Sequence, residues 1–328
     1  MPTAQTPLTS QSFEYTENPE SPENQEGFET VRTAPIGPNG FGLEITGFDC
    51  AAAGPAALDT VRAWLFEHRV LVFRDQHLED PARYEAFMRR IGTPIPHVLQ
   101  DLTVPGHPAI LKISDYVHPD GTPSGVLDGG TYWHSDMSYL PHTGIATSLY
   151  ALRAAEQSGG TEFLDLRHGW QLAAREPDLL AALGCADPQD ALDLPVAHRF
   201  GNRHSDRDPG AVDQHLTREQ ADTLTSVRHR LVERHPVTGV PSLFATSGTP
   251  RALGEADERS SAEALDRLES FLLSHLAGHT HRYRPGDLVV WDNMSTLHRG
   301  TGVRATSELD QCRLLHRINV HYTEEATP

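Results

Sequence analysis

The chain of 328 residues has almost no lysine and very little cysteine. Lys112 is its single lysine, so lysine-based chemistry such as a Schiff base has only one candidate. The three cysteines, Cys50, Cys185 and Cys312, are odd in number and far apart. This spacing argues against a disulfide framework and a CxxC site, and it predicts a reducing, cytoplasmic location.

Basic surface and long apolar runs are also scarce. The net charge of -18 argues against nucleic-acid and anionic-membrane partners, because both bind basic surfaces. No apolar stretch approaches the length of a membrane span, and no basic start followed by an apolar run indicates a secretory signal. A small anionic substrate remains compatible with this charge, since a pocket can be basic inside an acidic protein.

The rest of the composition is ordinary for a globular protein, with 38% hydrophobic and 22% charged residues. Residues 1–30 are polar and acidic, which predicts a disordered tail before a single domain over 31–328. Strands are predicted over 41–45, 70–73, 109–111, 145–152, 288–291 and 313–322. Helices are predicted over 55–68, 80–91, 166–183, 216–233 and 261–275, and a loop over 199–210. This order predicts a mainly β fold with helical insertions rather than regular βαβ alternation.

A histidine precedes an aspartate by two positions in three places. The three pairs are His118 and Asp120, His134 and Asp136, and His204 and Asp206. Side chains two apart leave a strand on the same side, so both can reach one metal ion. The first pair lies in a turn-like segment and the third in a polar loop. Aromatic and apolar neighbours predict a half-buried strand around the middle pair, which we therefore favour as metal ligands.

A second pattern lies far along the chain. The run Gly-Asp-Leu-Val-Val-Trp-Asp-Asn at 286–293 predicts a turn and a buried strand, and His298 follows it. Two imidazoles and one carboxylate can hold a divalent metal on one face, an arrangement typical of non-haem Fe(II) oxygenases. Arg313 downstream suits an acidic co-substrate. His279 and His281 form a rival pair of the kind a zinc hydrolase uses, but no third ligand is obvious nearby and no HExxH is present.

Together with Ser-Gly-Gly-Thr at 158–161 and Arg-Leu-Leu-His-Arg at 313–317, these motifs resemble the TauD/TfdA superfamily. Its members are Fe(II)- and 2-oxoglutarate-dependent dioxygenases, with taurine dioxygenase as the type member. The resemblance extends, discontinuously, from about residue 41 to residue 322. It implies a double-stranded β-helix (jelly-roll) core with helical insertions, and a reaction of O2 and 2-oxoglutarate that releases succinate and CO2.

The resemblance also implies individual roles. The ligands of Fe(II) would be His134, Asp136 and His298. Arg313 would pair with the far carboxylate of 2-oxoglutarate, to which Thr161 would donate its hydroxyl, and Trp291 would pack beside the co-substrate. The interval between His298 and Arg313 is a few residues longer than in taurine dioxygenase, so Arg317 remains an alternative partner for 2-oxoglutarate.

The same resemblance suggests a substrate class. His97 and Arg317 match the two positions that hold the sulfonate of taurine, and Met137 and Tyr139 fall at pocket-lining positions. They predict a carboxylate, sulfonate or phosphonate on the substrate. Gly130 stands where an asparagine would meet the amine of taurine, which argues against taurine and favours an amino-acid-like or natural-product acid. Hydroxylation is expected, although desaturation, cyclisation and bond cleavage use the same apparatus.

Two other classes remain open. A zinc-dependent hydrolase could use some of the same histidines without O2 or a keto acid. A non-catalytic jelly-roll binding protein is disfavoured, because every ligand position carries a competent residue. Asp136 predicts oxygenation rather than halogenation, since related halogenases lack this carboxylate. A homo-oligomer is compatible with the family, but no feature of the sequence indicates a symmetry.

Overall fold

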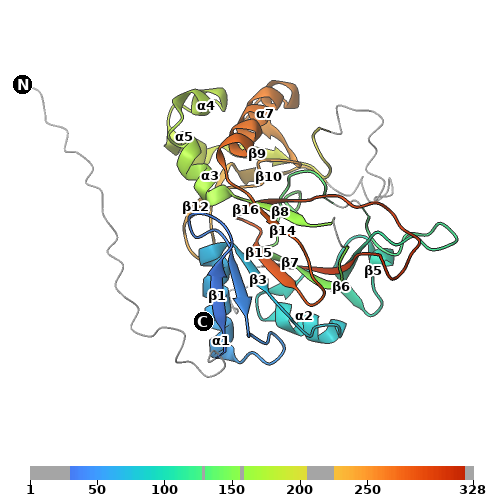
Figure 1. Cartoon of the computed structure of the whole chain (residues 1–328). Helices are drawn as coiled ribbons and strands as arrows, with labels where there is room; N and C mark the ends of the chain where they lie inside the picture. Colours follow the sequence, from blue (N-terminus) through green and yellow to red (C-terminus); the bar gives the residue numbers. More distant parts are fainter. Residues whose placement is uncertain (1–29, 128–129, 156–158, 205–224, 322–328) are drawn as a thin grey trace, which may run out of the picture.

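The computed structural model of this protein describes residues 30–127, 130–155, 159–204 and 225–321 (Figure 1). The predicted tail over 1–30 lies outside the described residues except for Thr30. The described chain is mainly β with some helices, as the sequence predicts. None of the helices in these four segments has the length and apolarity to cross a membrane.

The largest sheet has nine strands, in the order β1-β2-β3-β15-β7-β17-β6-β5, with β4 also pairing with β17. Its strands are β1 Arg32–Pro35, β2 Leu43–Thr46, β3 Val70–Phe73, β4 Thr93–Pro94, β5 Thr103–Val104, β6 His107–Ser114, β7 Ala146–Arg153, β15 Leu288–Asp292 and β17 Leu314–His321. All its neighbouring strands pair antiparallel except β2 and β3, which are parallel. Strands distant in the sequence, such as β7 and β17, therefore lie side by side.

Three smaller sheets complete the β structure. The sheet β14-β8-β16 comprises His279–His281, Thr161–Asp165 and Thr296–Gly300, in that order. The sheet β10-β9-β13 comprises Val227–Arg230, Pro195–His198 and Pro250–Leu253. The last pair is β11 Val232–Arg234 with β12 Pro241–Leu243.

Helices lie at two ends of the molecule. They are α1 Pro55–His68, α2 Pro81–Arg89, α3 Leu166–Ala173, α4 Pro177–Ala182, α5 Pro188–Asp193 and α7 Glu258–His275, with a short 3-10 helix, η2, at Gln100–Leu102. In Figure 1, α3, α4, α5 and α7 gather near β9 and β10, whereas α1 and α2 lie beside the large sheet. The described residues form three buried apolar clusters. One includes side chains of α1 and α2, one includes side chains of α3, α4, α5 and α7, and the third includes side chains of the large sheet and Phe163.

Strand β15 shows how the large sheet separates two of these clusters. Leu288 and Val290 pack on the side of α1 and α2. Val289 and Trp291 pack on the opposite side, together with Phe163 of β8. Successive side chains of a strand point to opposite faces, so an unbroken apolar run buries both faces of this sheet. The cluster that contains Val289 and Trp291 lies between the large sheet and the sheet β14-β8-β16, where the site described below also lies.

Several predicted elements agree closely with the structure. Helix α1 has the predicted bounds of 55–68. Helix α2 begins after Asp80, whose side chain accepts a hydrogen bond from the backbone N–H of Ala82 at 3.0 Å, as an N-cap should. Helix α7 begins three residues before the predicted start, because Asp257 caps it by accepting from the backbone N–H of Ser260.

The prediction of one helix over 166–183 is wrong. Helix α3 ends at Ala173, and α4 begins at Pro177. Proline has no backbone N–H and disfavours the helical conformation of the residue before it. Glu176 accordingly has φ -111° and ψ 88°, and the segment divides into two short helices.

The predicted helix over 216–233 begins outside the described residues, and its described part is wrong. Residues 227–230 form β10, which pairs antiparallel with β9, and Val232 begins β11. The exposure of side chains alternates along β10, the period of a strand rather than a helix. Pairing with β9 supplies the backbone hydrogen bonds that decide the conformation.

Candidate metal centre

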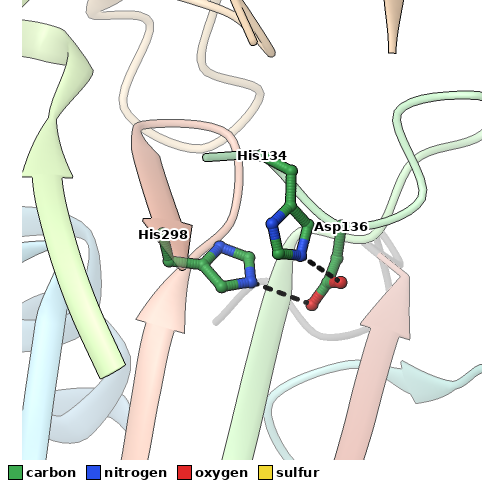
Figure 2. Close-up of side chains that lie close together, drawn as sticks. All are labelled: His134, Asp136 and His298. Atoms are coloured by element: carbon green, nitrogen blue, oxygen red, sulfur yellow. Dashed lines mark ion pairs between the residues drawn. The ribbon is translucent and has the colours of Figure 1, made fainter. Parts of the chain in front are cut away.

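Three predicted ligands converge in the structure. One donor atom from each of His134, Asp136 and His298 lies within 4.8 Å of the others. The Asp136 carboxylate stands between the two rings, with Oδ1 3.6 Å from His134 Nε2 and Oδ2 3.6 Å from His298 Nε2 (Figure 2). This is the only such group of histidine, cysteine, aspartate and glutamate among the residues that the structure describes. His279 and His281 belong to no comparable cluster in that part of the chain.

A backbone bridge brings the two histidines together. The N–H of His134 donates to the carbonyl of His298 at 3.0 Å, and the N–H of His298 donates back at 2.9 Å. The residues are thus direct cross-strand neighbours, and their ring centroids lie 4.2 Å apart. The half-buried strand predicted around His134 is wrong, since this isolated bridge is all that forms and Asp136 begins a turn.

The histidines present lone pairs to the centre. The Tyr132 carbonyl accepts a hydrogen bond from Nδ1 of His134 at 2.8 Å, which leaves Nε2 unprotonated in the neutral ring. Burial, reinforced by His134, lowers the pKa of His298 to about 3, so its imidazole is neutral at pH 7. The Nδ1 atom of His298 is buried with no hydrogen-bond partner among the described residues. Metal binding uses a lone pair on a ring nitrogen, which the tautomer of His134 and the neutral ring of His298 can supply.

The carboxylate of Asp136 is charged. Burial would raise the pKa of Asp136, but Arg317, His298 and His134 outweigh burial and hold it well below its usual range. Two imidazoles and one carboxylate form a donor set suited to a divalent transition metal. The fit is therefore chemical as well as geometric.

A glycine lies against the metal-binding edge of His134. A Cβ atom on Gly130 would stand 2.4 Å from Cε1 and 2.9 Å from Nε2 of this ring. Gly300 of β16 donates a backbone hydrogen bond to the Gly130 carbonyl at 2.7 Å, which fixes the approach. The residue that sequence comparison marks as a departure from taurine dioxygenase thus leaves space for a metal ligand.

The predicted co-substrate residues share one pocket with the two histidines. Thr161, Trp291 and Arg313 all line it, as does Arg317. The Trp291 ring centroid lies 4.8 Å from that of His298. The pocket lies between the large sheet, which supplies β6, β7, β15 and β17, and the small sheet, which supplies β8 and β16.

Arg313 and Thr161 both line this pocket, and Thr161 contacts Tyr283, a residue that the sequence analysis does not single out. The guanidinium of Arg313 donates to the carbonyls of Gly159 at 3.3 Å and Leu127 at 3.4 Å. The Thr161 hydroxyl lies 2.9 Å from the hydroxyl of Tyr283, which is buried. Tyr283 belongs to none of the motifs in the sequence, because it lies between the His279 and His281 pair and the run that begins at Gly286.

Arg317 lies against the metal centre and against His97. Its Nη1 donates to Asp136 Oδ1 at 3.2 Å, and its Nη2 lies 2.9 Å from His97 Nε2. Met137 is buried beside Asp136 with φ 56°, and the Tyr139 ring packs edge-on against Phe200 at 4.9 Å. Neither Met137 nor Tyr139 belongs to the lining of the pocket, so their substrate contact stays a prediction.

Two histidines and one carboxylate that converge beside a pocket with two arginines are typical of the class of mononuclear non-haem iron oxygenases. The chain belongs to the family described as "Taurine catabolism dioxygenase TauD, TfdA family", whose profile matches residues 32–319. It is an enzyme, a dioxygenase that uses Fe(II), 2-oxoglutarate and O2.

Similar proteins agree with this assignment. Pentalenolactone F synthase of Streptomyces arenae is 29% identical over 279 residues, which cover 81% of this chain and 86% of that protein. The (S)-phenoxypropionate/alpha-ketoglutarate-dioxygenase of Sphingobium herbicidovorans is 28% identical over 271 residues, 80% of this chain and 86% of that protein. A crystal structure of a taurine dioxygenase from Burkholderia xenovorans aligns with a TM-score of 0.66 at 22% identity, covering 90% of this chain and 92% of that chain. This last likeness concerns the fold alone.

Proposed function

We propose that this dioxygenase hydroxylates a small amino-acid-like or natural-product acid, with Fe(II) held by His134, Asp136 and His298. The observation that carries this proposal is the convergence of the three donor atoms within 4.8 Å, beside a pocket with two arginines. When bound, Fe(II) with O2 supplies an oxidant for a substrate C–H bond while 2-oxoglutarate is converted to succinate and CO2. The large and small sheets that enclose the pocket are consistent with a jelly-roll core, which we include in the proposal.

Arg313 is the proposed partner of the far carboxylate of 2-oxoglutarate. Its guanidinium lies among backbone carbonyls, and Thr161 lines the same pocket with a hydroxyl that can donate. A bidentate contact between guanidinium and carboxylate suits the flat carboxylate of a keto diacid. Trp291, beside His298, would provide an apolar wall for the carbon chain of the co-substrate. Arg317 is the less suitable partner, because it already contacts Asp136.

Arg317 and His97 are the proposed anchor for an anionic group of the substrate. The backbone N–H of Leu99 donates to Nδ1 of His97 at 3.0 Å, so the neutral ring carries its proton on Nε2. That N–H then faces the donor Nη2 of Arg317 at 2.9 Å. In the opposite tautomer Nδ1 of His97 would carry the proton, and the N–H of Leu99 would then face this N–H, so two donors would meet there instead. An anionic oxygen that accepts from both Arg317 and His97 would remove this conflict.

The names of two relatives bear on the substrate class, and one of them supports an acid. One is named for phenoxypropionate, a carboxylate, and another for the synthesis of pentalenolactone F. Asp136 occupies the third ligand position with a carboxylate, which supports oxygenation rather than halogenation. Contacts from Met137 and Tyr139, a cytoplasmic location and self-association remain predictions.

The proposal can be tested in two stages. Protein mixed with Fe(II) and 2-oxoglutarate without O2 should develop a weak visible charge-transfer band, as expected for the keto acid bound at the metal. A panel of carboxylates, sulfonates and phosphonates should then be incubated in air and scored for substrate-dependent release of succinate. Matched neutral esters or amides of each active acid serve as controls. Equal turnover of acids and neutral analogues would contradict the anionic anchor while leaving the dioxygenase chemistry intact.

A further inference from the structure

Asn293 fixes the main chain of Asp136. The Asp136 N–H donates to Asn293 Oδ1 at 2.8 Å, and Asn293 Nδ2 donates to the Asp136 carbonyl at 2.8 Å. The same amide nitrogen also donates to the Gly144 carbonyl at 3.1 Å. Asn293 is fully buried and directly follows the last residue of β15. These contacts hold the peptide units on both sides of Asp136, so the remaining freedom of this residue is the rotation of its side chain.

Asn319 contacts the carboxylate itself. Its Nδ2 donates to Asp136 Oδ2 at 3.1 Å and to Thr147 Oγ1 at 2.7 Å. Asn319 on β17 and Thr147 on β7 are direct cross-strand partners, and both are buried. Both hydrogens of the amide are therefore engaged, one by the strand next to it and one by the carboxylate. The orientation of the amide is set by the sheet before any metal binds.

Arg317 and Asn319 each contact a different oxygen of the Asp136 carboxylate. They lie two positions apart on β17, so their side chains leave the same face of the sheet. Arg317 donates to Oδ1 and Asn319 to Oδ2. The two donors differ in charge. The guanidinium is a cation and competes with a metal ion for the carboxylate, whereas the neutral amide orients the carboxylate with less competition. If Arg317 turns toward the anion of the substrate, Asn319 remains on Oδ2.

We propose that Asn319 is a positioning residue for the metal centre, which holds the Asp136 carboxylate in the orientation that binds the ion. Thr147 acts through it by fixing the amide. The inference rests on the proposed function, in which Asp136 is a metal ligand. Partners of this kind orient ligating carboxylates, and their loss commonly weakens metal binding by about 10- to 100-fold.

The test measures Mn(II) affinity of the full-length protein by electron paramagnetic resonance, without substrate or 2-oxoglutarate. Asn319→Leu keeps a side chain of similar size and removes the donor. It should weaken Mn(II) binding about 10-fold or more. Thr147→Val keeps the Asn319 amide but frees it to rotate, so it should weaken binding by a smaller factor than Asn319→Leu does. The charge-transfer band of the Fe(II) and 2-oxoglutarate complex should also shift in Asn319→Leu, because the carboxylate is reoriented.

Ser148→Ala is the matched control for Thr147→Val. Ser148 is the next residue of β7, equally buried, and its hydroxyl lies 2.6 Å from that of Tyr84 on the opposite face. It should lose stability without losing Mn(II) affinity. If Asn319→Leu fails to fold, the comparison of Thr147→Val with Ser148→Ala decides the question.

Two results would overturn the inference. One is unchanged Mn(II) affinity in a folded Asn319→Leu protein whose Asp136→Ala counterpart has lost binding. The other is equal weakening by Thr147→Val and Ser148→Ala, which would indicate a general loss of packing. A wild-type protein that binds no Mn(II) would instead overturn the proposed function, and this inference with it.

Discussion

Asp136 and Arg317 lie 3.2 Å apart, measured from Oδ1 to Nη1. The residue proposed to hold the substrate therefore touches the carboxylate proposed to hold the metal. Arg317 reaches His97 with its other terminal nitrogen, so one guanidinium spans both sites. Binding of an anion to this guanidinium would change the partner of a metal ligand, which offers a physical link between the arrival of substrate and the state of the metal centre.

Replacing each arginine separately should distinguish their roles. Arg317→Ala should raise the KM for substrate at least about 30-fold, because truncating one partner of a buried charge pair costs about 2 kcal/mol or more. The KM for 2-oxoglutarate should change little. Arg313→Ala should show the reverse pattern. Steady-state kinetics at saturating Fe(II) measure both constants, and an exchanged pattern would reassign Arg317 to the co-substrate.

Asp136→Asn should abolish detectable turnover and weaken Mn(II) binding by more than about 100-fold, since even partners outside the ligand set contribute up to that factor. The substitution preserves the shape of the side chain but removes the charge that Arg317 and the metal both require. Isothermal titration with Mn(II) gives the affinity, and unfolding of the metal-free protein provides the control for stability. Wild-type affinity in this variant would exclude Asp136 as a ligand.

Gly130→Ala should impair the metal centre through His134. The added Cβ would lie 2.4 Å from Cε1 of the ring, and φ is 81°. Gly121→Ala is the matched control, because φ is 87° there and no atom lies within 4 Å of the added carbon. Both variants should lose about 1–2 kcal/mol of stability from the left-handed backbone.

Only Gly130→Ala should weaken Mn(II) binding, by about 10-fold or more if the displaced ring behaves like other perturbed ligands. Chemical unfolding and Mn(II) titration of the two proteins measure the two effects separately. Equal Mn(II) affinities would mean that the His134 ring yields to the methyl group without consequence for the metal.

Much of this site was predictable from local spacing. The aromatic and apolar neighbours of His134 and Asp136 distinguish this pair from two similar ones, and the position of His298 after a buried strand indicates the third ligand. The bridge between His134 and His298 was not predictable, because it depends on pairing between distant segments. Asn319 could have been noticed, since it lies two positions after Arg317 on a predicted strand and so shares its face.

The errors in the fold have two origins, a local signal and pairing between distant strands. Pro177 divides the predicted helix over 166–183, a local signal that the apolar periodicity obscured. Residues 227–230 form a strand because β9 offers an edge to pair with, which no local pattern reveals. Strands β8 and β16, which carry Thr161 and His298, are not among the strands that the sequence predicts. Short strands depend on their neighbours for hydrogen bonds, whereas α1 carries its own bounds in its sequence.

Stability should fall in mild acid, partly because of a histidine away from the metal. Burial, reinforced by His229 and Arg251, lowers the pKa of His198 to about 3. Its Nδ1 lies 2.9 Å from Thr249 Oγ1, and its Nε2 is buried without a hydrogen-bond partner among the described residues. In the folded protein the ring stays neutral until about pH 3, whereas in the unfolded chain it gains a proton below about pH 6.5. The neutral His198 ring therefore makes its full contribution to the free energy of unfolding above about pH 6.5, and this contribution is lost as the pH falls toward 3.

The contribution of one such group changes by about 1.4 kcal/mol per pH unit within that window. His198→Gln removes the titrating group, so the free energy of unfolding of the variant should depend less steeply on pH than that of the wild type between pH 6 and 4. Urea unfolding of the metal-free proteins at several pH values measures the difference. Above about pH 7.5 the difference between the two proteins should be constant, because His198 is then neutral in both states. Parallel curves from pH 4 to pH 8 would show that His198 takes up no proton on unfolding.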